Sequence, residues 1–313
     1  MVALDWGTSS LRAYLLADGG RIVDRRAESW GILQLPERDF GAALERITSD
    51  WSREHGALPA LASGMIGSAQ GWVEAAYVDL PAGVAALAHG LATVTGSRLR
   101  IVPGVAQRGE FPDVMRGEET QIVGALTSAP DLGDGVVVLP GTHSKWVRLS
   151  AGLVSGFTTF MTGELFAVLR THSILGRLAP EGAGEASDPD GFARGVLASQ
   201  HSSGGLSSLL FSARASVLVG DLPAGSSLEY LSGLLIGDEL RAGLATGARP
   251  HALIGDPALC ARYRAALELL GISAVRILDD TAPAGIWTIA EHASIMSQRE
   301  PGSSRNPVSG RSN

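Results

Sequence analysis

The strongest constraint on the fold is a stretch that occurs twice. Residues 2–16 and 136–149 each consist of an apolar run, a turn with the pattern Gly-Thr-x-Ser, and a second apolar run. Each copy continues through a turn containing glycine into a third run, at residues 21–28 and 153–160. Such runs, bounded by glycine and rich in valine, predict β-strands, and their repetition predicts two halves built alike. The alternative is a pair of ordinary β-hairpins with no common role.

The two Gly-Thr turns indicate an anion site. A turn of small residues leaves backbone N–H groups and hydroxyls free to face an anion. In the first copy these groups belong to Gly7, Thr8 and Ser9, and in the second to Gly141 and Thr142. Two such turns facing each other could hold a polyphosphate between two halves of one molecule.

Composition narrows the class of protein. The chain has 313 residues, 45% hydrophobic and 18% charged, which suits a soluble globular protein of about two domains. The net charge of −7, without a basic block, argues against nucleic acid as the main partner. A single cysteine, Cys260, fits a reducing cytosol. No signal segment precedes the first strand, and no apolar run is long enough to span a bilayer.

The order of elements predicts two similar α/β lobes with a cleft between them, because both halves follow the order β-β-β-α-β-α. The predicted boundaries are residues 1–132 for the first lobe, 133–296 for the second, and 297–313 for a disordered tail. Acidic, glycine-rich residues 180–191 are expected to form a surface loop. Helices are expected at residues 39–54 (capped by Asp39), from 81, after 117, from 162 (capped by Thr162), and at 206–217, 228–244, 257–270 and 283–291. Further strands are expected at 60–63, 99–102, 251–255 and 275–278.

The opening Leu4-Asp5-Trp6-Gly7-Thr8-Ser9-Ser10 resembles the first phosphate motif of the sugar-kinase, heat-shock-protein and actin superfamily. Within it, the chain more closely resembles the 2-dehydro-3-deoxygalactonokinases. The pieces that carry this resemblance are Asp5-Trp-Gly, Gly64-Met-Ile-Gly67-Ser68, Val114-Met-Arg-Gly-Glu-Glu-Thr-Gln121, Leu139-Pro-Gly-Thr-His-Ser-Lys-Trp146, Met161-Thr-Gly-Glu-Leu165, Leu231-Ser-Gly-Leu-Leu-Ile-Gly237 and residues 281–285.

The resemblance implies a fold and an activity. The fold is actin-like (ribonuclease H-like): two lobes, each a mixed sheet with flanking helices, and ATP bound in the cleft. The activity is Mg²⁺-dependent transfer of phosphate from ATP to the terminal hydroxyl of 2-dehydro-3-deoxy-D-galactonate, giving its 6-phosphate in galactonate catabolism. Partners would be a small sugar acid and ATP, with no nucleic acid or membrane, in the cytoplasm. The oligomeric state stays open, a homodimer included. The alternatives are a kinase of a related sugar or keto-deoxy acid, a regulatory nucleotide-binding protein, and a phosphohydrolase.

Three residues are expected to carry the chemistry. Asp5 ends the first strand, where a carboxylate can hold Mg²⁺ directly or through water. Glu118 follows Gly117, at the place where similar sugar kinases have the base for the acceptor hydroxyl. Glu119 is its rival, because adjacent helical residues point about 100° apart and only one can face the cleft squarely. The planar guanidinium of Arg116 suits the carboxylate of a 2-keto acid. Each residue also has a purely structural alternative. Asp5 could only form the turn, Glu118 and Glu119 could only interact favourably with the dipole at the helix N-terminus, and Arg116 could be a surface arginine.

The remaining candidates are expected around these. On the nucleotide side they are Gly7, Thr8, Ser9, Gly141, Thr142, His143, Lys145, Gly255 and Asp256. Pro140 stands where the superfamily often has a second aspartate, which leaves the metal mostly to Asp5. Lys145 could offer a charge to phosphate or be a solvated strand lysine, and Arg262 and Tyr263 could flank adenine. On the sugar side the candidates are Met65, Ile66, Gly67, Ser68 and Glu164.

Overall fold

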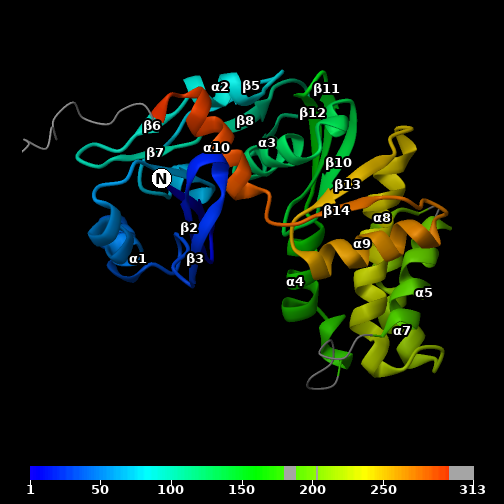
Figure 1. Ribbon diagram of the computed structural model, residues 1–313. Coiled ribbons are helices and arrows are strands. Elements are labelled where there is room, and N and C mark those ends of the chain that lie inside the picture. The colour runs from blue at the N-terminus through cyan, green and yellow to red at the C-terminus, as the bar shows by residue number, and fades with distance from the viewer. Residues whose placement is uncertain (180–187, 202–203, 296–313) are drawn as a thin grey trace, which may run out of the picture.

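The computed structural model describes residues 1–179, 188–201 and 204–295 (Figure 1). The predicted tail at 297–313 and most of the predicted surface loop, residues 180–187, lie outside the described residues.

The first half of the chain forms a six-stranded sheet in the order β3-β2-β1-β4-β7-β6. Strand β1 pairs antiparallel with β2 and parallel with β4, and β4 pairs parallel with β7. The strands are β1 (Val2–Trp6), β2 (Leu11–Leu16), β3 (Ile22–Glu28), β4 (Ala60–Ser63), β6 (Ala92–Thr93) and β7 (Leu99–Ile101).

The second half forms a five-stranded sheet in the order β12-β11-β10-β13-β14. Strand β10 pairs antiparallel with β11 and parallel with β13, and β13 pairs parallel with β14. The strands are β10 (Gly135–Leu139), β11 (Ser144–Ser150), β12 (Leu153–Phe160), β13 (Pro250–Ile254) and β14 (Arg276–Leu278). The order and directions repeat those of β3-β2-β1-β4-β7, which confirms the two predicted lobes of similar build.

Helices cover both sheets, and most lie where the sequence predicts them. Helix α1 (Phe40–His55) begins after Asp39, whose side chain accepts a hydrogen bond from the Ala42 amide as a cap. It buries Phe40, Ile47 and Trp51 on one face. The others are α2 (Val84–His89), α3 (Glu118–Ser128), α4 (Thr162–His172), α5 (Pro189–Gln200), α6 (Leu206–Leu210), α7 (Ser212–Leu218), α8 (Ser227–Ala245), α9 (Pro257–Leu269) and α10 (Ala282–His292).

Helix α5 was not predicted, and it packs along α8 with backbones in contact. A Cβ atom on Gly195 would lie 2.1 Å from the Tyr230 carbonyl oxygen, and one on Gly233 would lie 2.1 Å from that of Phe192. Gly233 of α8 therefore serves helix packing.

A small third sheet, also not predicted, joins the lobes in the order β5-β8-β9. It consists of β5 (Tyr77–Asp79), β8 (Gly104–Gln107) and β9 (Asp113–Met115). Its side chains bond to β12 of the second lobe: Gln107 accepts from the Phe157 amide at 2.9 Å, and Asp113 from the Thr159 amide at 2.7 Å. The lobes are thus fastened along one side.

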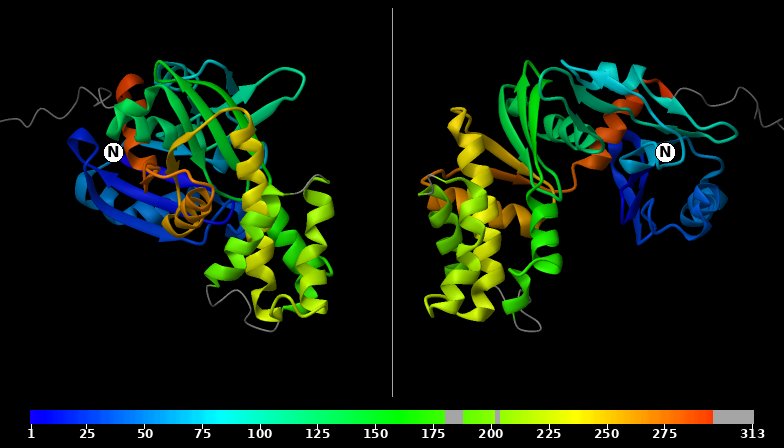
Figure 2. Two further views of the ribbon diagram at one scale, coloured as in Figure 1. Left: turned by 90° about the vertical axis from the view of Figure 1, so that its right-hand side faces the viewer. Right: turned by 180° about the vertical axis from the view of Figure 1, so that it is seen from behind.

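Helix α10 returns from the second lobe to the first. It contacts α3, α2 and β1, and Ile286 and Ile289 are fully buried in the core there. Figure 2 shows it in orange-red, lying on the blue and cyan lobe. The boundary expected at 133–296 therefore gave the last helix to the wrong lobe, because a pattern of elements does not show which sheet a terminal helix covers. Among the described helices, none is both long and apolar enough to cross a bilayer.

Candidate active site

Three glycine turns of the first lobe meet at one edge of its main sheet. Strands β1 and β4 run parallel with Asp5 opposite Ser63, so the turns that follow them are neighbours. A Cβ atom on Gly64 would lie 2.8 Å from the Trp6 carbonyl oxygen, and one on Gly117 would lie 3.4 Å from Gly64 Cα. Both glycines have positive φ, 98° and 110°. Glycine is needed here for close approach and for backbone shape, and the contacts bring the start of α3 beside the first Gly-Thr turn.

The structure separates the two carboxylates at the start of α3. Glu119 is 1% exposed, and it accepts hydrogen bonds from the Gly117 amide at 2.7 Å and the Thr120 hydroxyl at 3.1 Å. Burial and the neighbouring Glu118 charge raise the pKa of Glu119 to about 7. Glu118 is partly exposed and accepts from the Arg116 amide at 3.0 Å. Glu119 is thus enclosed by protein, and Glu118 is the one that a ligand can reach.

The second Gly-Thr turn follows β10 and lies against the start of α4. A Cβ atom on Gly163 would lie 2.5 Å from the Gly141 carbonyl oxygen. The Glu164 amide donates to the Thr142 carbonyl at 3.0 Å, and the Glu164 carboxylate bonds to His143 Nε2 at 2.5 Å. His143 and Glu164 therefore form an exposed pair at this turn.

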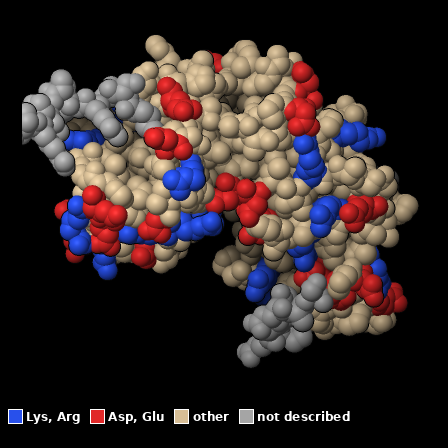
Figure 3. All heavy atoms as spheres, viewed as in Figure 1, with Lys and Arg blue, Asp and Glu red and all other residues tan. Residues whose placement is uncertain are grey.

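Lys145 links the two lobes beneath the turn. Its side chain is 5% exposed, and Nζ donates to the Val114 carbonyl at 2.8 Å and to Thr159 Oγ1 at 2.7 Å. The alternative of a solvated strand lysine is wrong, because β12 and the small third sheet cover Lys145. Burial raises the pKa of Glu118, while the charges of Lys145 and His143 lower it in part. Glu118 of the first lobe thus lies within electrostatic reach of both residues of the second. Figure 3 shows the surface notched between the lobes, with acidic side chains at the inner end of the notch.

Asp5 lies beside a second aspartate. Its carboxylate faces Arg12 Nη1 at 3.5 Å. Burial raises the pKa of Asp5, and the charge of Asp280 raises it further against the lowering effect of Arg12. Asp280, which the sequence reasoning missed, accepts from the Tyr14 hydroxyl at 2.8 Å. Its only signal in the sequence is its place next to Thr281, the start of one of the motifs quoted above.

The carboxylates around Asp5 suit Mg²⁺, which needs few protein ligands, better than a metal ion that is coordinated entirely by side chains. The described residues hold no group of three or more His, Cys, Asp or Glu side chains placed to bind a metal. Mg²⁺ keeps several waters and is commonly held by one or two carboxylates together with substrate phosphates. Asp5, with Asp280 near it, meets that requirement.

Arg116 has two buried nitrogens without a partner. Nη2 donates to the Ala75 carbonyl at 2.8 Å, and the guanidinium lies 4.4 Å from the centre of the Tyr77 ring. Nε and Nη1 are buried and make no hydrogen bond to any described residue. The alternative of a plain surface arginine is wrong, because the side chain is half-buried and protein encloses two of its nitrogens, which have no hydrogen-bond partner among the described residues.

The turn after β4 offers less side-chain surface than expected. Ile66 is fully buried in the core of the first lobe, so its predicted contact with the sugar is wrong. Gly67 is also buried, and a Cβ atom on it would lie 3.0 Å from Arg116 Nη1. Met65 stays partly exposed, and Ser68 donates to the Met65 carbonyl at 2.7 Å. This turn covers Arg116, and Met65 and Ser68 are its reachable side chains.

The turn after β13 lies next to the second Gly-Thr turn, since a Cβ atom on Gly255 would lie 3.6 Å from the Pro140 carbonyl oxygen. Asp256 caps α9 by accepting from the Leu259 amide at 2.9 Å. The two residues proposed to flank adenine are engaged elsewhere. Tyr263 is 1% exposed, and Arg262 pairs with Glu229 at 2.9 Å.

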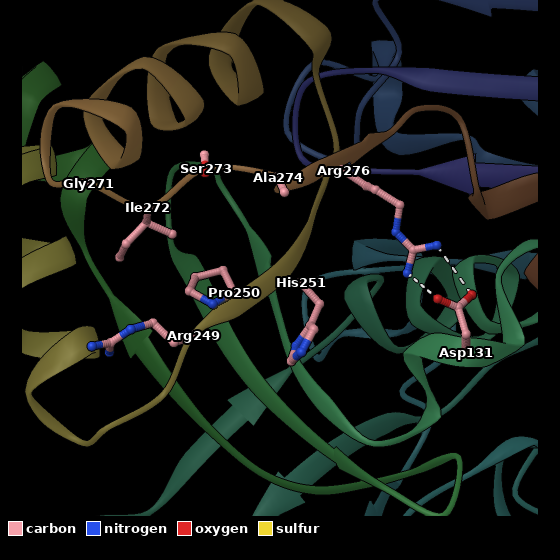
Figure 4. A pocket seen from close by; sticks show the side chains of 9 residues that line it. All are labelled: Asp131, Arg249, Pro250, His251, Gly271, Ile272, Ser273, Ala274 and Arg276. Atoms are coloured by element: carbon pink, nitrogen blue, oxygen red, sulfur yellow. Dashed lines mark hydrogen bonds and ion pairs between the residues drawn. The ribbon is translucent and has the colours of Figure 1, made fainter.

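A shallow pocket of about 550 Å³ lies at the opposite end of the second lobe (Figure 4). Pro250 and His251, at the start of β13, line it, and Arg276 there pairs with Asp131 at 2.7 Å. The Gly-Thr turn and Gly255 follow the other ends of β10 and β13, so this pocket is separate from the site.

Comparison with known proteins agrees with this arrangement. Residues 5–289 match the family model of 2-keto-3-deoxy-galactonokinase. The chain is 40% identical over 286 residues to the probable 2-dehydro-3-deoxygalactonokinase DgoK1 of Rhizobium meliloti, covering 88% of this chain and 91% of that protein. It is 36% identical over 293 residues to the 2-dehydro-3-deoxygalactonokinase of Escherichia coli, covering 92% and 97%.

Solved structures show the same fold. A protein from Sinorhizobium meliloti, provisionally assigned as a 2-dehydro-3-deoxygalactonokinase, superposes with a TM-score of 0.84 at 36% identity, covering 93% of this chain and 98% of the other. The activator of 2-hydroxyisocaproyl-CoA dehydratase from Clostridium difficile shares the fold alone, with a TM-score of 0.51 at 13% identity over 97% and 99% of the two chains. By its sequence over nearly its whole length and by its fold, the chain belongs to the 2-keto-3-deoxy-galactonokinase family.

Proposed function

We propose that the protein transfers the terminal phosphate of ATP to the terminal hydroxyl of 2-dehydro-3-deoxy-D-galactonate, in the cytoplasm. The observation that carries this proposal is the position of Glu118, which belongs to the first lobe but lies close to charged residues of the second. A reachable carboxylate in one lobe lies near Lys145 and His143 of the other, beside two Gly-Thr turns. The family match supports the substrate. The single cysteine, Cys260, is free and buried, which agrees with the reducing environment of the cytoplasm.

Phosphoryl transfer needs positioning and charge stabilisation more than covalent chemistry. The backbone amides and hydroxyls of Thr8, Ser9 and Thr142 bind the phosphate oxygens. Asp5, with Asp280, would hold Mg²⁺, which would neutralise charge on the phosphates. Gly255 and Asp256 form the wall nearest the nucleoside.

Glu118 accepts the proton of the sugar hydroxyl as the hydroxyl oxygen bonds to the terminal phosphorus of ATP and the bond from that phosphorus to ADP breaks. A general base works best when its pKa lies near the working pH. Burial raises the pKa of Glu118 toward that range, and the charges of Lys145 and His143 hold back part of the rise.

Arg116 binds the carboxylate of the substrate through one of its unpaired nitrogens, Nε or Nη1, by a charge-assisted hydrogen bond. The two nitrogens face different sides of the guanidinium, and Nη2, which would complete a parallel pair with either, donates to the Ala75 carbonyl. Because protein atoms cover both nitrogens, the turn at residues 65–68 shifts when the substrate enters. Met65, Ser68 and Glu164 then face the sugar hydroxyls.

A coupled assay of ADP release tests the proposal over a panel of keto-deoxy acids, with the neutral sugar galactose as a control. We expect turnover that needs both ATP and a sugar acid and is fastest with 2-dehydro-3-deoxygalactonate. A phosphohydrolase would release ADP equally well without any sugar acid, and a regulatory protein would bind ATP without turnover. Either result would contradict the proposal.

A further inference from the structure

A buried carboxylate of the second lobe lies outside the site described above. Glu239, on α8, is 2% exposed and accepts hydrogen bonds from three other elements. Oε1 accepts from Trp146 Nε1 of β11 at 2.9 Å. Oε2 accepts from the Thr162 hydroxyl at the start of α4, at 2.5 Å, and from the Tyr263 hydroxyl of α9, at 2.6 Å. Thr162 was predicted as a helix cap, but its hydroxyl is used here instead.

The chain of hydrogen bonds continues to the second Gly-Thr turn. The Tyr263 hydroxyl lies 2.8 Å from Ser144 Oγ, and the Gly141 amide donates to the same Ser144 oxygen at 3.3 Å. Ser144 and Tyr263 are 0% and 1% exposed, so water does not replace these contacts. A path of three hydrogen bonds thus joins Gly141 to Glu239.

Burial raises the pKa of Glu239, and the hydrogen bonds from Thr162, Tyr263 and Trp146 lower it in part. In the ionised form, the direction of every bond in this path follows from the chemistry of the groups. An ionised carboxylate only accepts, so the single proton of Tyr263 points to Glu239. The tyrosine oxygen must then accept from Ser144, and the Ser144 oxygen accepts from the Gly141 amide. The carboxylate therefore orients each hydroxyl in turn.

The hydrogen-bond path affects the backbone amides of the second Gly-Thr turn. The Gly141 amide points inward to Ser144, while the amides of Thr142 and His143 have no acceptor among the described residues. Burying a carboxylate is unfavourable in free energy because the group loses its hydration, unless hydrogen bonds from the protein compensate for that loss. One carboxylate here ties together the turn, the start of α4 that packs on it, and α9, which begins at the Gly255-Asp256 turn.

We propose that Glu239 is a positioning residue for nucleotide binding: through Tyr263 and Ser144 it fixes the turn at residues 141–143 with two amides facing the phosphates. The role of that turn rests on the proposed function, whereas the hydrogen-bond path does not. An unfixed turn would have to be ordered by the ligand, at a cost in affinity for ATP but not for the sugar acid.

The test compares Tyr263→Phe and Ser144→Ala in the full chain, each of which interrupts the path by removing one oxygen atom. The probe is a non-hydrolysable ATP analogue, with its affinity measured by calorimetry. Each variant should weaken binding about fivefold or more. The double variant should weaken it little beyond the single ones, because both interrupt the same path. In turnover assays KM for ATP should rise, while KM for the sugar acid stays within about twofold.

Trp146→Phe is the matched control, since it removes a hydrogen bond to the same carboxylate but leaves the path to Gly141 whole. Its affinity for the analogue should stay at the wild-type value, with folding of all variants checked by circular dichroism. Wild-type affinity in both Tyr263→Phe and Ser144→Ala would overturn the proposal. So would an equal loss in Trp146→Phe, which would show a general effect of disturbing the core. The binding measurement needs no turnover, so failure of the proposed activity would not hide either result.

Discussion

Gly124 of α3 and Gly285 of α10 face each other where the two helices cross, and each makes room for the backbone of the other. A Cβ atom on Gly124 would lie 1.8 Å from the Thr281 carbonyl oxygen, and one on Gly285 would lie 1.9 Å from that of Thr120. Helix α3 comes just before the second lobe in the chain and α10 just after it, so the two helices that flank this lobe in the sequence pack against each other.

Replacing Gly285 with alanine should force the helices apart. Overpacking of this kind typically costs about 1–3 kcal/mol, and the change also disturbs the start of α3 with Glu118. Urea unfolding should show the loss of stability. Gly41→Ala is the matched control in α1, because a Cβ atom there meets its nearest neighbour, Asp39 Oδ1, at 3.5 Å. It should be neutral or stabilise by up to about 1 kcal/mol. Equal stability of the two variants would contradict a tight crossing.

Asp5→Asn should lose Mg²⁺-dependent turnover while the protein stays folded. Among the described residues the Asp5 carboxylate forms one ion pair, with Arg12 at 3.5 Å, and the arginine is half-exposed, so loss of this pair should cost less than about 1 kcal/mol. Initial rates across a Mg²⁺ titration, with thermal unfolding alongside, provide the measurement. Near-normal activity with unchanged Mg²⁺ dependence would remove Asp5 from the metal site.

Glu118→Gln should still bind both substrates but lose about 10²–10⁴-fold in kcat, the usual contribution of a general base. Single-turnover kinetics separate this loss from product release. Glu119→Gln is the matched comparison, since it makes the same change one residue away in a carboxylate enclosed by protein. Wild-type chemistry in Glu118→Gln together with a large loss in Glu119→Gln would reverse the assignment.

Glu119 should also make folding depend on pH. Its pKa is about 7 in the folded protein, against an ordinary value of 4.5. Between these values the folded state holds a proton that the unfolded state has lost, so this contribution to the free energy of unfolding falls as pH rises from about 4.5 to 7. The fall should be roughly 2–3 kcal/mol. Urea unfolding across this range should show a shallower decline for Glu119→Gln than for wild type, and parallel curves would contradict the raised pKa.

Arg116→Ala should raise KM for the sugar acid about ten- to a hundredfold, the scale of a lost charge-assisted hydrogen bond, with little change for ATP. Arg108→Ala is the control, because that arginine is 76% exposed and pairs with Asp79 at the surface. Steady-state kinetics with each substrate varied in turn give the answer. Equal effects on both substrates would indicate a structural role for Arg116.

The parts of the fold that could be predicted are those that repeat or have local signals. The Gly-Thr turns and their flanking strands predicted both lobes, and Asp39 predicted the start of α1. The small third sheet was missed because its strands have only three or four residues each and Pro103 interrupts the pattern before β8. The position of α10 was missed because its packing depends on Gly124, far away in the sequence.

The site shows the same division. Asp5, Gly117 and Glu118 stand in recognisable motifs at strand and helix ends, and the structure brings their turns together. The burial of Lys145, Ile66 and Glu239 depends on elements that pack over them from elsewhere in the chain. No local pattern marks Glu239, because it becomes distinctive only when β11, α4 and α9 bring three donors to one carboxylate.

The most direct test of the account is to identify the product by ³¹P nuclear magnetic resonance after incubation with ATP, Mg²⁺ and 2-dehydro-3-deoxygalactonate. We predict one phosphomonoester on the terminal carbon for each ADP formed, with no inorganic phosphate beyond that of a blank without enzyme. Inorganic phosphate released in step with ADP, or a phosphate on any other hydroxyl, would contradict the account.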